Sequence, residues 1–266
     1  MTNDSALRFQ SFSSGSSGNC YYLGTYQGGI LIDAGVGIRT LKTDLARIGL
    51  TYDHIAAVLV THDHADHIRS LGSYCKRLGK PVWMTRTLSK ALAIHWSTGQ
   101  YLGPVLQVLP DEGPAEIVPG RVFATPFVVP HDATQTVGYN IEFDGCRFVI
   151  MTDVGAMTEE ALGYAREAST VVVEANYDPV MLRNGSYPRE LQDRIRGGHG
   201  HLSNGETAQA IRDFMHEGLR NVFLCHLSAN NNTPELALEA TRPAVEGTGV
   251  RIEALPRTSP SAFFEL

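Results

Sequence analysis

The sequence of 266 residues lacks any apolar run long enough to cross a membrane. Its longest uninterrupted aliphatic stretch, residues 55–60, is far shorter than the roughly 18 residues that a bilayer requires. Residues 1–9 include polar and acidic side chains, whereas a signal peptide needs a basic start followed by an apolar stretch. We therefore expect a cytoplasmic protein with no membrane partner.

An excess of positive charge is also missing. The chain has 22 lysines and arginines against 28 aspartates and glutamates, so its formal net charge is −6. This balance excludes a protein that coats nucleic acid through a broad basic face. It does not exclude an enzyme that acts on phosphates, because bound divalent metals supply local positive charge that the count omits.

Closely spaced cysteines are absent too. The four cysteines are far apart and form no Cys-x-x-Cys pair: Cys20, Cys75, Cys146 and Cys225. In a cytoplasmic chain this pattern predicts reduced, mostly buried thiols. The remaining composition, 43% hydrophobic and 19% charged, is typical of a folded protein and excludes a disordered one.

Strand and helix patterns alternate along the chain. Apolar runs bounded by turn residues predict strands at 6–12, 19–25, 29–33, 55–60, 136–143, 146–151, 171–174 and 222–225, with shorter ones near 82, 105 and 122. Helical spacing and start signals predict helices at 40–48, 67–78, 157–168, 203–215 and 234–245. The serine-glycine run at 11–18 predicts a tight connecting loop. This alternation indicates an α/β or α+β layered fold.

The densest cluster of metal-binding side chains directly follows the strand predicted at 55–60. His62 and His64, two residues apart, can face one metal ion from an extended or looping backbone. Asp66 and His67 lie where the chain turns into a helix and can face a second ion. Imidazole nitrogens and carboxylate oxygens suit Zn²⁺ and, with more oxygen ligands, Mn²⁺ or iron. The spacing favours a metal site over a polar loop with scattered histidines.

Two metal ions need more ligands than this loop provides. His131, Asp153 and His226 each follow a predicted strand. A polar residue in such a place is usually a cap or a loop residue, but three in a chain that also holds the histidine cluster favour ligands. Asp33 ends a strand as well, and we expect its carboxylate to accept the second N–H of a ligand histidine and orient the ring.

The order of these motifs resembles the metallo-β-lactamase fold superfamily, and more closely the YycJ/WalJ family of bacterial metal-dependent nucleases. The segments that carry the likeness extend from about residue 7 to 240 and are 13–19, 61–67, 129–132, 152–154, 174–176, 200–204, 225–228 and 231–234. The resemblance implies an α+β fold, a four-layer αββα sandwich, with the site at one edge of its two sheets.

The resemblance also divides the candidate ligands between two metal positions. It implies that the first ion is bound by His62, His64 and His131, the second by Asp66, His67 and His226, and that Asp153 bridges the pair. The expected cofactors are two divalent ions, Zn²⁺ or Mn²⁺. Ions roughly 3.5–4 Å apart lower the pKa of a shared water to near 7 and neutralise charge on a phosphoryl oxygen during attack.

Catalytic roles are expected for Asp66 and His201. His201 precedes the helix at 203–215, and the matching histidine of related phosphodiesterases serves as a general acid or oxyanion donor. Candidate substrate contacts are polar residues in three segments: Ser16, Ser17 and Asn19 in the serine-glycine loop, Arg183 and Arg189 in a basic segment, and Asn231 and Asn232 after His226. For these, a glycine-dependent turn, a solvated helix face and a helix cap are the alternatives.

The resemblance implies a dimetal phosphodiesterase, most closely a 5′→3′ exonuclease that acts on DNA rather than RNA. A predicted strand, a basic segment and a helix fill the sequence between Asp153 and His226, which leaves no room for the inserted domain of β-CASP nucleases. We therefore expect residues 1–266 to form a single domain. The alternative function is hydrolysis of a small ester, thioester or lactone by a glyoxalase-II-like enzyme, because such enzymes use the same ligands on the same fold.

Overall fold

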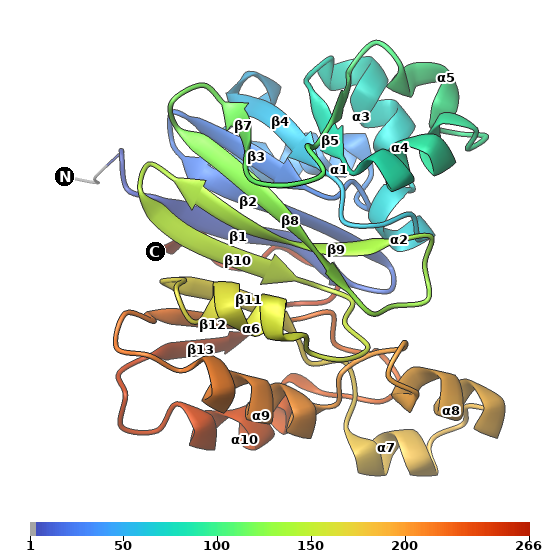
Figure 1. The fold of residues 1–266 in the computed structure, drawn as a ribbon, viewed down its shortest axis with the longest axis vertical. Helices are drawn as coiled ribbons and strands as arrows, with labels where there is room; N and C mark the ends of the chain where they lie inside the picture. Colours follow the sequence, from blue (N-terminus) through green and yellow to red (C-terminus); the bar gives the residue numbers. More distant parts are fainter. Residues whose placement is uncertain (1–3) are drawn as a thin grey trace.

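Two β-sheets lie face to face, and helices cover the outer face of each (Figure 1). The structure is a computed structural model that describes residues 4–266, so the first three residues of the N-terminal segment considered above lie outside it. Within the described residues each sheet has seven strands. The four layers confirm the expected αββα sandwich of the α+β class.

The first sheet has the strand order β14-β1-β2-β3-β4-β5-β6. Its strands are β1 (Arg8–Gly15), β2 (Gly18–Thr25), β3 (Gly28–Ile32), β4 (Ile55–Leu59), β5 (Val82–Met84), β6 (Leu106–Val108) and β14 (Phe264–Glu265). Strands β3 to β6 are parallel. The helices on the same side of the molecule are α1 (Ile38–Arg47), α2 (Ala65–Ile68), α3 (Leu71–Leu78), α4 (Arg86–Ala93) and α5 (Gly99–Leu102), with the short helix η1 (Tyr52–His54) before β4.

The second sheet has the order β13-β12-β11-β10-β9-β8-β7. Its strands are β7 (Ala115–Val118), β8 (Val122–Val129), β9 (Thr136–Phe143), β10 (Cys146–Met151), β11 (Thr170–Glu174), β12 (Asn221–Cys225) and β13 (Arg251–Ala254). Its helices are α6 (Glu159–Ala165), α9 (Asn204–Phe214), α10 (Pro234–Thr241) and η2 (Arg242–Ala244). Helices α7 (Pro179–Asn184) and α8 (Arg189–Arg196) lie on the side toward which β10 points (Figure 1).

The core consists of three main apolar layers, one between the sheets and one under each set of helices. Phe9, Tyr139 and Phe223 belong to the central layer and are fully buried. Burial of a large apolar side chain contributes about 1.5–3 kcal/mol relative to exposure, so this layer fixes how the sheets face each other. The carboxyl ends of β4, β10, β11 and β12 consequently meet at one edge.

The serine-glycine run was wrongly predicted to be a loop. Strand β1 continues through Gly15 and β2 begins at Gly18, so only two residues form the turn. Serines are accommodated in the strand because distant groups satisfy their hydroxyls: Ser13 donates to the carbonyl of Arg257, and Ser14 bonds the hydroxyl of Tyr21. Helices α4, α5, α7 and α8 were not predicted as helices from the sequence.

Two other sequence-based expectations can be compared with the structure. Within residues 4–266, no helix is both long enough and apolar enough to pass through a bilayer. The four cysteines are unpaired, and Cys146 is the exposed one while the others are buried.

Gly35 provides a test of the packing that holds the loop after β4. A Cβ atom at this position would overlap the backbone of Asp66 and Asn19. We predict that Gly35→Ala lowers the free energy of unfolding by about 1–3 kcal/mol through overpacking. The control, Gly163→Ala, adds a Cβ inside α6 with nothing within 4 Å and should raise stability by about 0.5–1 kcal/mol. Denaturant unfolding measures both, and equal effects would contradict the packing argument.

A candidate metal centre

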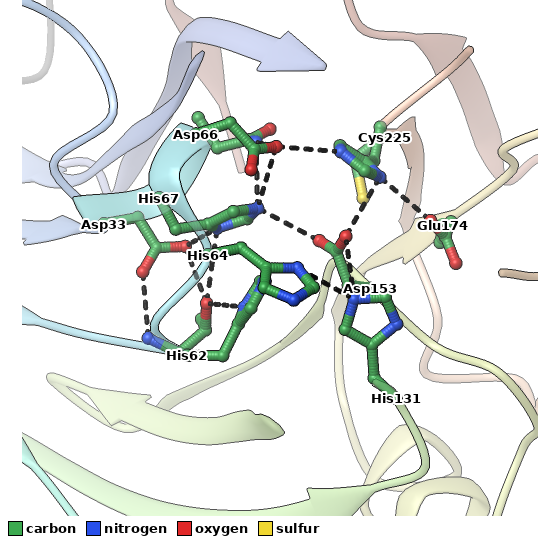
Figure 2. Close-up of polar contacts among 12 residues, drawn as sticks. Asp33, His62, His64, Asp66, His67, His131, Asp153, Glu174 and Cys225 are labelled. Atoms are coloured by element: carbon green, nitrogen blue, oxygen red, sulfur yellow. Dashed lines mark hydrogen bonds and ion pairs between the residues drawn. The ribbon is translucent and has the colours of Figure 1, made fainter. Parts of the chain in front are cut away.

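Seven histidine and aspartate side chains converge at the edge where the strands of both sheets end (Figure 2). His62 follows β4, His131 follows β8, Asp153 follows β10 and His226 follows β12. These four positions come from distant parts of the sequence. Parallel and antiparallel pairing within the sheets brings them to the same edge, as the pattern of polar residues after strands predicts.

The first group of side chains comprises His62, His64 and His131. One ring nitrogen of each lies within 4.8 Å of the others. The His64 Nδ1 and His131 Nε2 atoms are 3.3 Å apart. His131 is oriented by the carbonyl of Gly200, which accepts from its Nδ1 at 2.7 Å and leaves Nε2 toward the centre.

The second group comprises Asp66, His67 and His226, whose donor atoms also lie within 4.8 Å of one another. The Asp66 Oδ2 atom is 3.4 Å from His226 Nε2 and 3.6 Å from His67 Nε2. His226 has a φ of 53°, a left-handed conformation that is uncommon outside glycine. Hydrogen bonds hold it there, because its N–H donates to Ser14 Oγ and its carbonyl accepts from Asn176.

Asp153 lies between the two groups. Its Oδ2 atom is 3.1 Å from His67 Nε2, and its Oδ1 atom is 3.3 Å from His226 Nδ1 and 3.6 Å from His131 Nε2. The side chain is buried. One carboxylate therefore contacts histidines of both groups, which is the place expected for a bridging residue.

A buried nitrogen and the donor set of the cluster favour a cation site. Among residues 4–266, His62 Nε2 has no hydrogen-bond partner, although this atom is shielded from solvent. An uncompensated buried polar atom costs several kcal/mol at most sites, so such atoms are retained where a ligand satisfies them. The donor set of imidazole nitrogens and carboxylate oxygens is the one that Zn²⁺ and other divalent ions prefer. The residues present fit a divalent metal ion.

The charges in the cluster shift its pKa values in opposite directions. Burial alone would lower the pKa of His67, but the carboxylates of Asp33 and Asp153 outweigh it and raise this pKa to about 10. Burial lowers the pKa of His62 well below its usual range, and the neighbouring His67 adds to the effect. Burial would raise the pKa of Asp153, yet the charges of His226 and His67 hold it well below the ordinary value.

Asp33 occupies the position expected for an orienting carboxylate. It is buried at the end of β3, with Oδ2 at 2.7 Å from His67 Nδ1. The backbone N–H and the hydroxyl of Thr61 both donate to it at 2.8 Å. These bonds fix the ring of His67 so that Nε2 points to the metal centre (Figure 2).

Glu174 is a functional candidate that the sequence reading missed. It ends β11 and is fully buried. Its Oε1 atom is 2.7 Å from His201 Nδ1 and 2.9 Å from His226 Nδ1, while Oε2 accepts from the N–H groups of Val154 and Leu202. The signal was available, because Glu174 ends a strand just as Asp33 does. It connects the predicted acid His201 to the ligand candidate His226.

A cavity of about 260 Å³ opens onto these groups. Ser16 and His201 line it, as expected of residues near a substrate. Arg183 and Arg189 do not line it and are exposed elsewhere on α7 and α8; the arginine that does line it is Arg194, which pairs with Asp132.

Four asparagine and serine side chains that were predicted to contact the substrate do not line this cavity. Asn19 is fully buried and its amide donates to Gly15 and Asp66, so it positions a ligand candidate instead of facing a substrate. Asn232 is buried and its side chain bonds Asn204 and the carbonyl of Ala175. Asn231 is buried as well, and Ser17 lines a different cavity.

A model of the beta-lactamase superfamily domain matches residues 29–226, a segment that contains every candidate ligand. The chain belongs to this superfamily. The match covers strands of both sheets and the loops that carry the metal centre, but not β1, β2, β13 or β14.

Individual proteins are also similar to this chain over most of its length. The chain is 32% identical over 234 residues to exodeoxyribonuclease WalJ of Streptococcus pneumoniae, covering 87% of this chain and 85% of the relative. It is 29% identical over 249 residues to exodeoxyribonuclease YycJ of Bacillus anthracis, covering 91% and 90%. The metallo-β-lactamase fold protein YhfI of Bacillus subtilis superposes with a TM-score of 0.70 at 14% identity over 97% of this chain and 99% of that one, a likeness of fold.

Metal uptake by this superfamily member is predicted to release protons. Without metal, the pKa of His67 is raised from 6.5 to about 10, so the ring is protonated at neutral pH and must lose its proton to bind. Metal affinity should therefore rise with pH across this interval. The same shift stabilises the metal-free fold below pH 6.5, and that contribution is lost as pH rises to about 10. Calorimetric titration in buffers of different ionisation enthalpy measures the release, and a buffer-independent heat would contradict it.

Proposed function

We propose that the protein is a two-metal nuclease that removes nucleotides from DNA in the 5′→3′ direction. The observation that carries the proposal is the pair of adjacent ligand groups that share Asp153 at one sheet edge. Two relatives that match most of the chain are exodeoxyribonucleases by name, which supports DNA as the substrate. We also propose that residues 1–266 form one domain, since α6 to α9 and β11 fill the sequence between Asp153 and His226.

The proposal assigns the ligands by their grouping. His62, His64 and His131 hold the first ion, and Asp66, His67 and His226 hold the second, with Asp153 shared. The ions proposed are Zn²⁺ or Mn²⁺. Bound divalent ions supply a hydroxide nucleophile at neutral pH and neutralise charge on the phosphoryl oxygens. We assign Asp66 a catalytic role because its carboxylate lines the cavity and would help to hold the second ion there.

His201 is proposed to protonate the leaving oxygen. Its side chain is 21% exposed and lines the metal-centre cavity, so one edge can reach a substrate. Burial would lower the pKa of His201, but the carboxylate of Glu174 outweighs it and raises this pKa. A raised pKa favours the protonated ring, and a protonated ring that faces the substrate is suited to act as a general acid.

Substitution of a ligand is predicted to remove metal and activity together. His64→Ala takes away one nitrogen of the first group, so the variant should bind less metal and lose cleavage of 5′-labelled DNA. Digestion of single- and double-stranded DNA labelled at the 5′ or the 3′ end, with and without added metal, measures polarity and dependence. Hydrolysis of thioester or lactone substrates without cleavage of DNA or bis-p-nitrophenyl phosphate would overturn the proposal in favour of a small-molecule hydrolase.

Substitution of the acid should separate metal binding from rate. His201→Ala is expected to keep the metal content of the wild type and to lose about 10²–10⁴-fold in kcat, the usual contribution of general acid catalysis. His199→Ala is the matched control, because His199 is an exposed neighbour that does not line the cavity. Full activity of His201→Ala would refute the acid role.

A further inference from the structure

A second cavity, of about 760 Å³, lies beside the metal centre. Of the described residues that line it, none is a candidate metal ligand. Its wall consists of part of β1, the β1–β2 turn, the loop before α1, one side of α1 as far as Arg47, the residues just after α2 and residues 258–260. We call it the arginine cavity, because Arg39, Arg47 and Arg69 line it.

The arginine cavity is positively charged although the chain carries a net charge of −6. Asp44, the acidic residue of its wall, already pairs with Arg47 at 2.7 Å. Arg39 is exposed, and among residues 4–266 its guanidinium has no ion-pair partner. Arg69 is fixed to the wall because its Nη2 donates to the carbonyl of Ser17. A free and an anchored guanidinium at a hollow surface are suited to bind phosphate.

Neutral donors surround the same cavity. The hydroxyl-bearing residues Ser17, Thr40 and Ser70 contribute to its wall. Helix α1 begins beside it after Gly37, with no side-chain cap and no acidic residue in its first turn. The N–H groups of that turn add a weak positive potential to the charge of the arginines.

A very thin wall separates the arginine cavity from the metal centre. Ser16 lines the metal-centre cavity, and Ser17, the next residue, lines the arginine cavity. Gly35 of the arginine cavity packs against the backbone of Asp66, a candidate ligand. A nucleic-acid strand carries one phosphate per about 3.4 Å along the helix axis, so a strand cut at the metal centre presents further phosphates within reach of the second cavity.

We propose that the arginine cavity binds a phosphate of the substrate strand while a nearby bond is cut at the metal centre. This inference rests on the proposed nuclease function. The phosphate is either an internal phosphodiester or the phosphate at the strand end, and the chemistry of recognition is the same for both. Arg39 supplies the free charge, and Arg69 holds the wall and offers its remaining N–H groups.

Charge changes at Arg39 test the proposal in the full-length, metal-loaded enzyme. Arg39→Gln is expected to raise KM for labelled single-stranded DNA several-fold, with kcat affected less. Loss of one phosphate contact should also lower the slope of log KM against log salt concentration by about 0.7. Arg39→Glu should raise KM further. The kcat/KM for bis-p-nitrophenyl phosphate, which carries one phosphate, should fall less than the kcat/KM for DNA.

The matched controls are Arg212→Gln and Arg212→Glu, which make the same charge changes at an exposed position of α9.

DNA with a 5′-phosphate and DNA with a 5′-hydroxyl distinguish the two kinds of phosphate. A higher KM of the Arg39 variants for both substrates indicates an internal phosphate, and a higher KM for the 5′-phosphate substrate alone indicates the terminal one. Two results would overturn the inference in an enzyme that cleaves DNA. One is an equal change of KM in the Arg39 and Arg212 variants, and the other is an equal fall of kcat/KM for DNA and for the small diester. If the wild type cleaves neither, the proposed function itself fails.

Discussion

The metal centre depends on the buried carboxylate of Asp153. A buried charge is costly unless other charges and hydrogen bonds compensate it, and here three histidines from distant parts of the sequence lie within 3.6 Å of its oxygens. Oδ2 lies 3.1 Å from His67 Nε2, so in the metal-free protein the protonated ring of His67 supplies part of this compensation. A metal ion at this edge would take the place of that proton, so the buried carboxylate is balanced with or without metal.

The fold provides the rigid frame that this centre requires. Strand ends from both sheets place the ligand candidates, and the central apolar layer fixes the sheets against each other. Two buried carboxylates, Asp33 and Glu174, then orient His67 and His226 from behind. Asp33 and His226 both adopt positive φ, a strained conformation that persists where surrounding bonds enforce it. The loops that carry function are therefore held by buried hydrogen bonds.

The sequence predicted what depends on local spacing and missed what depends on distant neighbours. His62 and His64 could be assigned because a strand followed by closely spaced histidines constrains both side chains at once. Asn232 was misassigned because its role is set by Asn204, which the chain brings to it only after folding. Glu174 ends a strand as Asp33 does, but its role could not be read from this position alone, because its partners His201 and His226 lie far along the sequence. The basic segment was noticed, but charge alone did not indicate which arginine faces the cavity.

Diffraction from crystals grown with Zn²⁺ or Mn²⁺ tests the central claim most directly. The account predicts two anomalous scattering peaks at the sheet edge. One should lie at about 2.0–2.2 Å from nitrogens of His62, His64 and His131, and the other at a similar distance from Asp66, His67 and His226, with Asp153 in contact with both. A fully metal-loaded crystal with no peak at this edge, or with these imidazoles turned away from a common point, would contradict it.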